Sequence, residues 1–446
     1  MRETRLAQIS IFENYAKHGR AEKLKQLSSI LDNHPEILDI IKKDLVNISI
    51  TKTGRKGLTV ENIFRCLLLK QQLQVSYDQL AFHLCDSMSY RTFTRLTDGF
   101  TPKKSALQST IRSISPETLE QVQIALSVHW LKNGDISLEK IRADSTVVKS
   151  NITPPSDSQL LNDSIRVLSR LFAKSRDETG IKLRFTDQRK ISKSLAFSIF
   201  NAKNAEKEVL YPKYLRIAHI VLKQAERALD NEGIKNSSYE KSQQWLADVE
   251  YYKKLLLKVI DQTQRRVIQK EKVPASEKIV SIFEEHTDII IKGFRDVHYG
   301  HKINLSSEKN GFITYLSIEN GNPTDTTLFL PVINAHQQQY DKLPKAIVCD
   351  GGYASKSNVE KGRAMGVKRV VFHKRVGISY TAMGVKIKTF KKLRDFRAGV
   401  EGNISELKRS FCASKALWKG HDGFKAFVWS SVISYNLVRL ARLQSG

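Results

Sequence analysis

Strand-forming sequence occurs in two blocks that a long helix-forming segment separates. The first block, residues 138–148, is rich in β-branched side chains, and the second begins at about residue 299. Residues 151–290 between them are rich in Lys, Glu, Leu and Ala at helical spacing. This pattern predicts an α/β core with a helical hairpin or small bundle inserted between its first and second strands. A coiled-coil partner surface is the alternative for the insertion. The helices expected there are roughly 158–175, 188–231 with a break near Tyr211-Pro212, and 238–269.

Residues 1–135 precede this pattern and predict a series of short helices. Thr59 and Ser76 are expected to cap two of them, and a third is expected to begin near Ser87. Short helices with tight turns are typical of a helix-turn-helix module that binds DNA. A plain helical packing or dimerisation domain gives the same pattern, so both interpretations stay open. The basic residues with which such a module could meet phosphates are Arg91, Arg95, Lys103, Lys104 and Arg112.

The second strand block predicts a β-hairpin, residues 299–306 and 312–318, joined by an Asn-Gly turn. A helix to about His336 and a strand ending at Asp350 should follow it. Further along, the sequence predicts a helix at about 354–365, a strand at 367–372, a helix that carries Glu401 and a last amphipathic helix at about 423–442.

Asp350 ends the short apolar run Ala346–Cys349 and is followed by two glycines. The run is too short for a helix, so it predicts a buried strand that delivers one carboxylate into an open site. The alternative is that Asp350 caps the following turn. In the first block, alternation places Asp144 on one strand face with Arg142 and Thr146.

A third acid lies in the late helix, where Glu401 and Glu406 are the candidates. Arg397, Glu401 and Lys408 are spaced by four and seven residues and share one helix face. Glu406 lies roughly 140° around the helix from Glu401, at about 100° per residue. An acid between two cations fits a metal ligand beside a DNA backbone, although an ordinary surface pair of Arg397 and Glu401 is the alternative.

The net charge is the strongest bulk signal: 73 Lys and Arg against 46 Asp and Glu, a net of +27. Such a field attracts polyanions, most commonly nucleic acid, whereas general basicity without a partner is the alternative. Residues 373–397 are especially basic and include the candidate DNA contacts Lys388 and Lys392. The four cysteines have no metal-binding spacing, which favours an intracellular protein without a zinc site or disulfide framework. Neither a signal peptide nor a membrane span is indicated.

With the insertion set aside, the order of strands, helices and acids resembles the ribonuclease H-like arrangement. The motifs are similar to those of prokaryotic insertion-sequence DDE transposases that carry a Tyr-(2)-Arg-(3)-Glu-(6)-Lys signature. Arg397, Glu401 and Lys408 match the signature, while Arg394 occupies the tyrosine position. The two aspartate motifs match as Ala143-Asp144-Ser145-Thr146 and Cys349-Asp350-Gly351-Gly352-Tyr353.

The resemblance covers nearly the whole chain. Residues 58 to about 123 resemble the N-terminal helical domain common to these transposases. Thr153–Leu161, Gly300-His301-Lys302 and Gly321-Asn322-Pro323-x-Asp325 match segments of one branch of the family. His301 is expected to be a strand residue that faces the rim of the cleft and not a ligand.

The resemblance implies a DDE transposase that cleaves DNA at the element ends and transfers strands into target DNA. Asp144, Asp350 and Glu401 would be its catalytic residues and would bind two Mg²⁺ ions, with Mn²⁺ as a substitute. Such ions lie about 3.5–4 Å apart and take hard oxygen ligands. Arg397, Lys408, Lys392 and Lys388 would hold the DNA. The alternatives are a nuclease without strand transfer and a catalytically inactive DNA-binding derivative.

The expected domains are a helical DNA-binding domain (1–135), a ribonuclease H-like catalytic domain (136–150 and 291–446) and a helical insertion (151–290). The expected partners are double-stranded DNA, both terminal inverted repeats and target DNA, and a second copy in a homodimeric synaptic complex. The expected location is the cytoplasm of a prokaryote, in association with the nucleoid.

Overall fold

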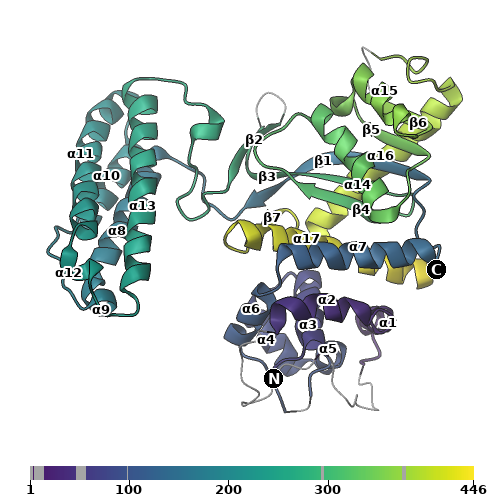
Figure 1. The fold of residues 1–446 in the computed structure, drawn as a ribbon, viewed down its shortest axis with the longest axis horizontal. Coiled ribbons are helices and arrows are strands. Elements are labelled where there is room, and N and C mark those ends of the chain that lie inside the picture. Colours follow the sequence, from purple (N-terminus) through teal and green to yellow (C-terminus); the bar gives the residue numbers. More distant parts are fainter. Residues whose placement is uncertain are drawn as a thin grey trace. The chain divides into compact units, whose positions relative to one another are not determined.

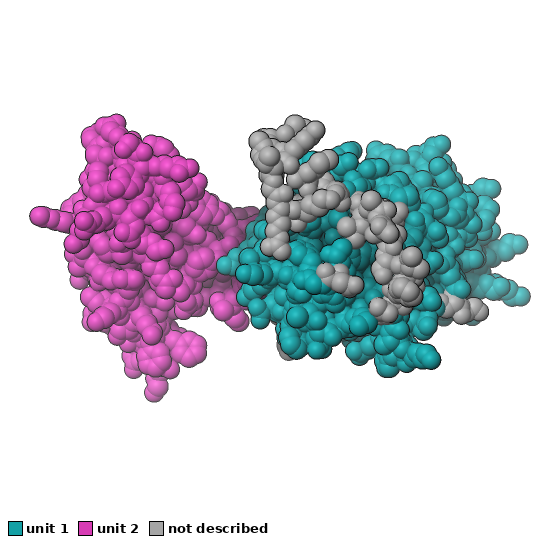
Figure 2. Space-filling view, turned by 90° about the horizontal axis from the view of Figure 1, so that it is seen from below, with its two compact units in different colours: residues 1–150, 300–446 teal, residues 151–299 magenta. Residues whose placement is uncertain are grey.

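The computed structural model describes residues 4, 15–46, 57–97, 99–292, 296–373 and 378–445. The chain forms two compact units, which Figure 2 colours separately. Unit 1 contains residues 1–150 and 300–446, and unit 2 contains residues 151–299. Within the described ranges, no helix is both long and apolar enough to cross a membrane.

Unit 1 begins with helices whose first residues are capped as the sequence predicts. The Thr59 hydroxyl accepts a hydrogen bond from the Asn62 amide, and the Asn62 side chain accepts one from the Thr59 amide. Ser76 and Ser87 cap the next two helices in the same chain order, which confirms the three predicted starts. The helices are α1 (Gly19–Asp32), α2 (Glu36–Leu45), α3 (Val60–Leu73), α4 (Tyr77–Asp86), α5 (Met88–Thr94), α6 (Lys104–Arg112) and α7 (Pro116–Lys132).

Three of the arginines predicted to meet phosphates form bonds within unit 1. Arg95 pairs with Asp32 at 2.7 Å and with Glu61 at 3.1 Å. Arg91 donates to the carbonyls of Thr97 and Phe100, and Arg112 donates to the carbonyl of Lys419. These bonds hold the three guanidinium groups against helices and loops, and their contact with phosphates stays a prediction. Lys103 and Lys104 are exposed.

The chain forms a mixed seven-stranded sheet with the order β2-β3-β1-β5-β6, in which β4 pairs with β3 and β7 with β1. All of its strands lie in unit 1 except β2 and the first residues of β3. β1 is antiparallel to β3 and parallel to β5, and β5 is parallel to β6. The predicted hairpin is present as β3 and β4. The strands are β1 (Lys140–Ser150), β2 (Asp288–Lys292), β3 (Asp296–Ser307), β4 (Ile313–Ile318), β5 (Ala346–Asp350), β6 (Arg369–His373) and β7 (Lys415–Ala416). β2 and β7 were not among the strands predicted from the sequence.

Four helices pack on this sheet or beside it (Figure 1). They are α14 (Phe329–Tyr340), α15 (Lys356–Ala364), α16 (Ile387–Ser410) and α17 (His421–Ser445). α16 contacts β1, β5 and β6, and its Leu393 joins the same buried cluster as Ile347 and Phe372. α17 packs on α7 and α3, which ties the N-terminal helices to the core. The predicted α/β class with a mixed sheet and a helical N-terminal region is confirmed.

Unit 2 is helical and follows β1 in the chain. Its long helices are α8 (Asp157–Ala173), α10 (Arg189–Asn201), α11 (Asn204–Leu229) and α13 (Ser242–Thr263), which Figure 1 shows side by side. Between them lie the short helices α9 (Ser175–Thr179) and α12 (Glu232–Lys235). The helix break predicted at Tyr211-Pro212 was wrong, because α11 runs through Pro212. Tyr211 and Tyr214 are buried there and hold the helix, whereas the chain is extended at Ala202. The Ser156 hydroxyl caps α8 by accepting a hydrogen bond from the Gln159 amide.

Candidate active site

Two neighbouring strands bring Asp144 and Asp350 next to each other at the point where β5 ends. β1 and β5 are parallel, and their last paired residues are Ala143 and Cys349. Asp144 and Asp350 are the next residue on each strand, so the register puts them side by side. Asp350 also starts a short 3-10 turn, Gly351–Tyr353, which ends the strand at the carboxylate. Because β5 is apolar and buried up to Cys349, the strand end is fixed by the core behind it.

A single guanidinium joins these aspartates to Glu401. Arg397 Nη2 lies 3.0 Å from Asp144 Oδ2 and 3.3 Å from Asp350 Oδ1. Arg397 Nη1 lies 2.8 Å from Glu401 Oε1, one turn along α16. The two strands and one helix therefore converge three carboxylates on one cation, although these residues are far apart in the sequence.

The three carboxylates differ in their access to solvent. The side chain of Asp144 is 16 % exposed, that of Asp350 45 % and that of Glu401 63 %. Arg397 is 12 % exposed, and its Nε is buried without a hydrogen-bond partner among the described residues. The site is thus closed on the side of the sheet and open on the side of Glu401 and Asp350.

α16 reaches the sheet through contacts at alternate residues of β1. Arg142 donates to the carbonyl of Phe396 at 2.8 Å, and Lys408 Nζ donates to Thr146 Oγ1 at 2.6 Å. Together with the Arg397–Asp144 pair, these bonds confirm that Arg142, Asp144 and Thr146 share one strand face.

Close approach of helix and strand depends on Gly399. A Cβ added at Gly399 would lie 2.0 Å from Arg142 Nη1, well inside van der Waals contact. The guanidinium of Arg142 occupies this space and also lies 4.7 Å from the ring centre of Phe396. A side chain at position 399 would therefore displace the Arg142 guanidinium, which donates to the carbonyl of Phe396 and joins β1 to α16.

The alternative acid, Glu406, is engaged elsewhere. It pairs with Arg439 and Arg442 of α17, each at 2.5 Å. Glu406 therefore ties α16 to α17, and only Glu401 of the two acids lies with the aspartates. Arg394, at the signature tyrosine position, pairs with its neighbour Asp395 at 2.9 Å.

A polar network supports Asp144 from behind. The Ser145 amide donates to Asp144 Oδ1 at 2.8 Å, and the Ser145 hydroxyl donates to Asp325 Oδ1 at 2.9 Å. Lys302 Nζ donates to the same Asp325 oxygen at 3.2 Å and to the carbonyl of Pro323 at 2.6 Å. The segments Gly300–Lys302 and Gly321–Asp325, noted in the sequence only as motifs, meet here. Their roles were missed because no local pattern shows that they contact Ser145.

Gly352 fits closely against this network. A Cβ at Gly352 would lie 2.8 Å from Asp325 Oδ2. The second glycine after Asp350 therefore makes room for the Asp325 carboxylate, whereas the sequence had suggested only an open approach.

The other predicted DNA contacts are spread more widely. Lys388 and Lys392 are exposed on α16. At about 100° per residue, they lie roughly 180° and 140° around the helix from Arg397, so α16 does not bring them to the carboxylates. Of the basic stretch 373–397, residues 374–377 lie outside the described residues.

His301 is buried, and the prediction that it faces a cleft rim was wrong. Its ring stacks on His421 at 5.0 Å and packs edge-on against Phe424, both on α17. Its Nδ1 lies 3.2 Å from the carbonyl of Glu319. The His301 side of β3 is therefore buried against α17.

The Cys349 thiol and the Tyr353 hydroxyl lie near the aspartates, and neither is activated as a nucleophile. Burial raises the pKa of the Cys349 thiol well above its usual value, and the negative charge of Asp144 adds to this effect. Burial likewise raises the pKa of the Tyr353 hydroxyl, which donates to Asn304 at 2.8 Å. Both groups therefore stay protonated at neutral pH.

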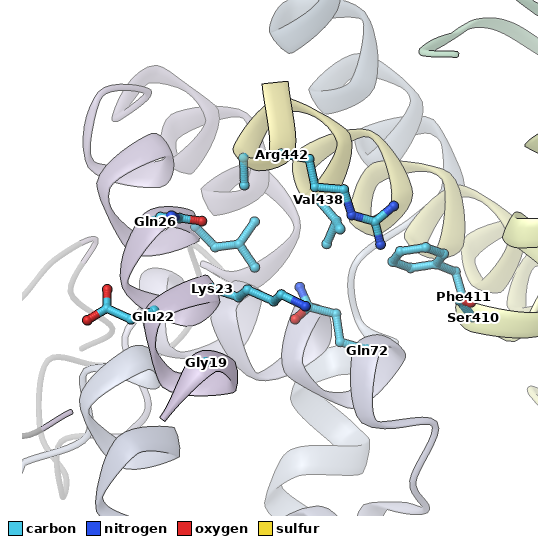
Figure 3. Close-up of a pocket in the computed structure, with 11 residues that line it drawn as sticks. Gly19, Glu22, Lys23, Gln26, Gln72, Ser410, Phe411, Val438 and Arg442 are labelled. Carbon is cyan, nitrogen blue, oxygen red and sulfur yellow. The ribbon is translucent and has the colours of Figure 1, made fainter. Parts of the chain in front are cut away.

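A separate hollow of about 580 Å³ lies between the N-terminal helices and α17. Figure 3 shows Lys23 of α1, Gln72 of α3 and Arg442 of α17 around it. Apolar side chains such as Leu27 and Val438 form part of its lining. None of the candidate catalytic residues lines this hollow, so it is not the active site.

Comparison with known families identifies both parts of unit 1. Residues 295–437 match the model of the Transposase DDE domain, and residues 12–113 match that of a Transposase domain (DUF772). No curated protein and no solved structure matches the chain. The DDE match includes Asp350 and Glu401, and its fold is ribonuclease H-like, in keeping with the mixed sheet. The DDE family cleaves nucleic acid with divalent metal ions. The chain belongs to the insertion-sequence DDE transposases.

Proposed function

We propose that this transposase cleaves DNA at the ends of its element and joins the freed 3′-hydroxyl to target DNA. The observation that carries the proposal is the convergence of Asp144, Asp350 and Glu401 on one guanidinium. Three carboxylates gathered around a single positive charge are a site that holds cations. Their oxygens are the hard donors that Mg²⁺ prefers.

The residues fit the metal that this family uses. Asp144, Asp350 and Glu401 would hold two Mg²⁺ ions, which Mn²⁺ can replace. When bound, the metal would supply activation of the attacking hydroxyl and stabilisation of the leaving oxygen. The exposure of Asp350 and Glu401 leaves the site accessible to a DNA backbone.

The chain's own residues would orient the site and hold the DNA. Ser145, Asp325 and Lys302 would hold the Asp144 carboxylate in one orientation. Arg397 and Lys408 would bind phosphates beside the scissile bond, and Lys388 and Lys392 would bind DNA on another face of α16. The spacing of Arg397, Glu401 and Lys408 supports membership of the Tyr-Arg-Glu-Lys class, with Arg394 in place of the tyrosine.

We assign the parts of the chain accordingly. Residues 1–135 would bind DNA, residues 136–150 with 291–446 would form the catalytic domain, and residues 151–290 would be a helical insertion. Both transposon ends and the target would be double-stranded DNA. Since two ends must be held together, a homodimer is the expected synaptic form. The protein would act in the cytoplasm of a prokaryote, at the nucleoid.

The test uses purified protein, duplexes that carry the terminal repeats flanking its gene, a target plasmid and Mg²⁺. We expect cuts at the repeat boundary and joined products. Asp350→Asn and Glu401→Gln should abolish both, whereas Glu406→Gln, on the same helix, should retain them. Cleavage by Asp350→Asn at the wild-type rate would refute the site.

The same assay separates the alternatives. Ends that are cut but never joined would identify a nuclease without strand transfer. Binding without any cutting by the wild type would identify a catalytically inactive DNA-binding derivative.

A further inference from the structure

Unit 2 contains a cavity of about 500 Å³ between α8 and α10, and none of the three acids lines it. Its wall on α8 consists of residues spaced by three or four, which share one helix face. They are Gln159, Asn162, Asp163, Arg166 and Arg170. Arg189, Lys190 and Lys193, from the first turns of α10, form the opposite wall. Five cations and one acid therefore line this cavity.

Two of the five cations are already neutralised. Arg166 pairs with Asp163 at 2.5 Å, and Gln159 also donates to this acid. Arg189 pairs with Asp187, just outside the cavity, at 2.6 Å. These pairs hold the two walls in shape but leave little charge for a ligand.

The other three cations give the cavity its charge. Arg170, Lys190 and Lys193 are exposed and form no ion pair within the part of the chain that the structure describes. They surround a hollow whose volume is within the range of ligand pockets, roughly 300–1,000 Å³. A phosphate group with its sugar therefore has both the space and the charge that it needs.

The start of α10 does not add to this attraction. Its N-cap residue, Gln188, makes no capping hydrogen bond with its side chain, but the Asp187 carboxylate accepts a hydrogen bond from the Arg189 amide at 3.0 Å. An acid of the chain therefore already occupies the positive end of this helix. The charge of the cavity comes from its three exposed cations.

The surface of α10 beyond Lys193 favours a nucleic acid over a free anion. Phe197 and Phe200 are 70 % and 81 % exposed, four and seven residues after Lys193. Apolar rings beside cations suit the sugars of a DNA backbone, which an inorganic anion lacks.

We propose that the cavity between α8 and α10 binds the DNA backbone, with Arg170, Lys190 and Lys193 as its phosphate contacts. The proposal rests on the proposed transposase function and gives the helical insertion a direct part in holding DNA. The ligand is a run of phosphodiester groups, recognised by charge and not by base sequence.

The test compares two double charge reversals in the full-length protein. Arg170→Glu with Lys193→Glu changes the cavity, and Lys213→Glu with Lys223→Glu changes exposed lysines of α11 that do not line it. Both pairs alter the net charge equally, so the long-range attraction for DNA is matched. All four side chains are exposed, so neither variant alters the core. Measured unfolding temperatures check that both variant proteins fold.

Binding is measured with a duplex carrying the terminal repeat, in EDTA, at several salt concentrations. The cavity pair should weaken binding at least about tenfold more than the control pair, and lower the salt slope by about 1–2 because each lost phosphate contact removes about 0.9. Equal losses in both variants, or no loss in the cavity variant, would overturn the proposal. Since EDTA prevents cleavage, this result is independent of whether the wild type cuts or joins DNA.

A second readout does not depend on any variant. Lys190 and Lys193 are labelled with an amine-specific reagent in the wild-type protein, with and without the duplex. The proposal expects DNA to protect both lysines and to leave Lys223 labelled. Equal labelling of Lys190 and Lys193 in both samples would overturn it.

Discussion

Replacement of Arg397 by methionine tests whether this cation balances the three acids before a metal binds. Methionine keeps an unbranched stem like that of the buried arginine but removes the guanidinium that contacts Asp144, Asp350 and Glu401. We therefore expect Arg397→Met to destabilise the metal-free protein and to increase its affinity for divalent cations.

The magnitude follows from the most shielded contact, that of Arg397 with Asp144 at 3.0 Å. At an effective dielectric constant of about 20, one such pair has a Coulomb energy of about 5–6 kcal/mol. Desolvation offsets much of this, and hydrogen bonds to charged groups contribute about 1.5–3 kcal/mol net. The contacts with Asp350 and Glu401 add less because both acids are half-exposed or more. The expected loss is about 2–3 kcal/mol, or a fall in the unfolding temperature of about 4–6 °C.

The assay is thermal unfolding of both proteins in EDTA and in increasing Ca²⁺, which binds carboxylates without the need for turnover. A saturating cation at about 100 times its Kd adds about 2.7 kcal/mol. Ca²⁺ should therefore restore the variant, but should act on the wild type only at higher concentration, since it competes with Arg397. Arg394→Met, which removes an exposed pair with Asp395, is the control and should change stability by less than about 0.5 kcal/mol. Equal stability of Arg397→Met and the wild type in EDTA, or equal Ca²⁺ responses, would refute this reasoning.

Three further predictions concern packing and positioning. Gly399→Ala should destabilise the protein by about 1–3 kcal/mol in chemical unfolding because the added Cβ meets Arg142. Gly402→Ala, with nothing near its Cβ, should instead be neutral or stabilise by up to about 1 kcal/mol, and equal effects at both glycines would contradict the close approach. Lys302→Met leaves Asp325 without its cation and should raise the Mg²⁺ concentration needed for half-maximal cleavage. Lys302→Arg should recover part of this loss. An unchanged metal dependence in Lys302→Met would exclude a positioning role for Lys302. Burial lowers the pKa of His336 to about 4, so the unfolded state binds a proton more readily than the folded state. The free energy of unfolding should therefore fall as the pH decreases from about 6.5 to 4, by at most about 3 kcal/mol. His336→Gln should remove this part of the pH dependence.

Helix caps and short apolar runs in the sequence predicted helices and strands well where residues a few positions apart form them. Thr59 and Ser76 cap their helices through residues three positions away, and the strand of Asp350 is short, apolar and followed by glycine. The predicted break at Pro212 failed because a distant contact decided it. The buried tyrosines on either side of this proline hold α11 together against the bundle, which a proline signal in the sequence does not reveal.

Long-range packing also decided which charged side chains are paired within the protein. Arg91 and Arg112 donate to loop carbonyls, and Arg95 pairs with Asp32. Arg170, Lys190 and Lys193 lie in a helical segment for which no motif predicted a DNA contact, and only the pairing of α8 with α10 gathers them around a cavity.

The sequence by itself determined that two of the three acids would lie on strands and the third on a helix. Periodicity and helix caps reveal this because they depend on residues a few positions apart. Only the tertiary structure decided that Glu401 and not Glu406 joins Asp144 and Asp350. The choice depends on how α16 lies against both β1 and α17: Gly399 lets the helix approach Arg142, while Arg439 and Arg442 draw Glu406 to the other side. Such contacts join residues that are distant in the sequence, and no local pattern records them.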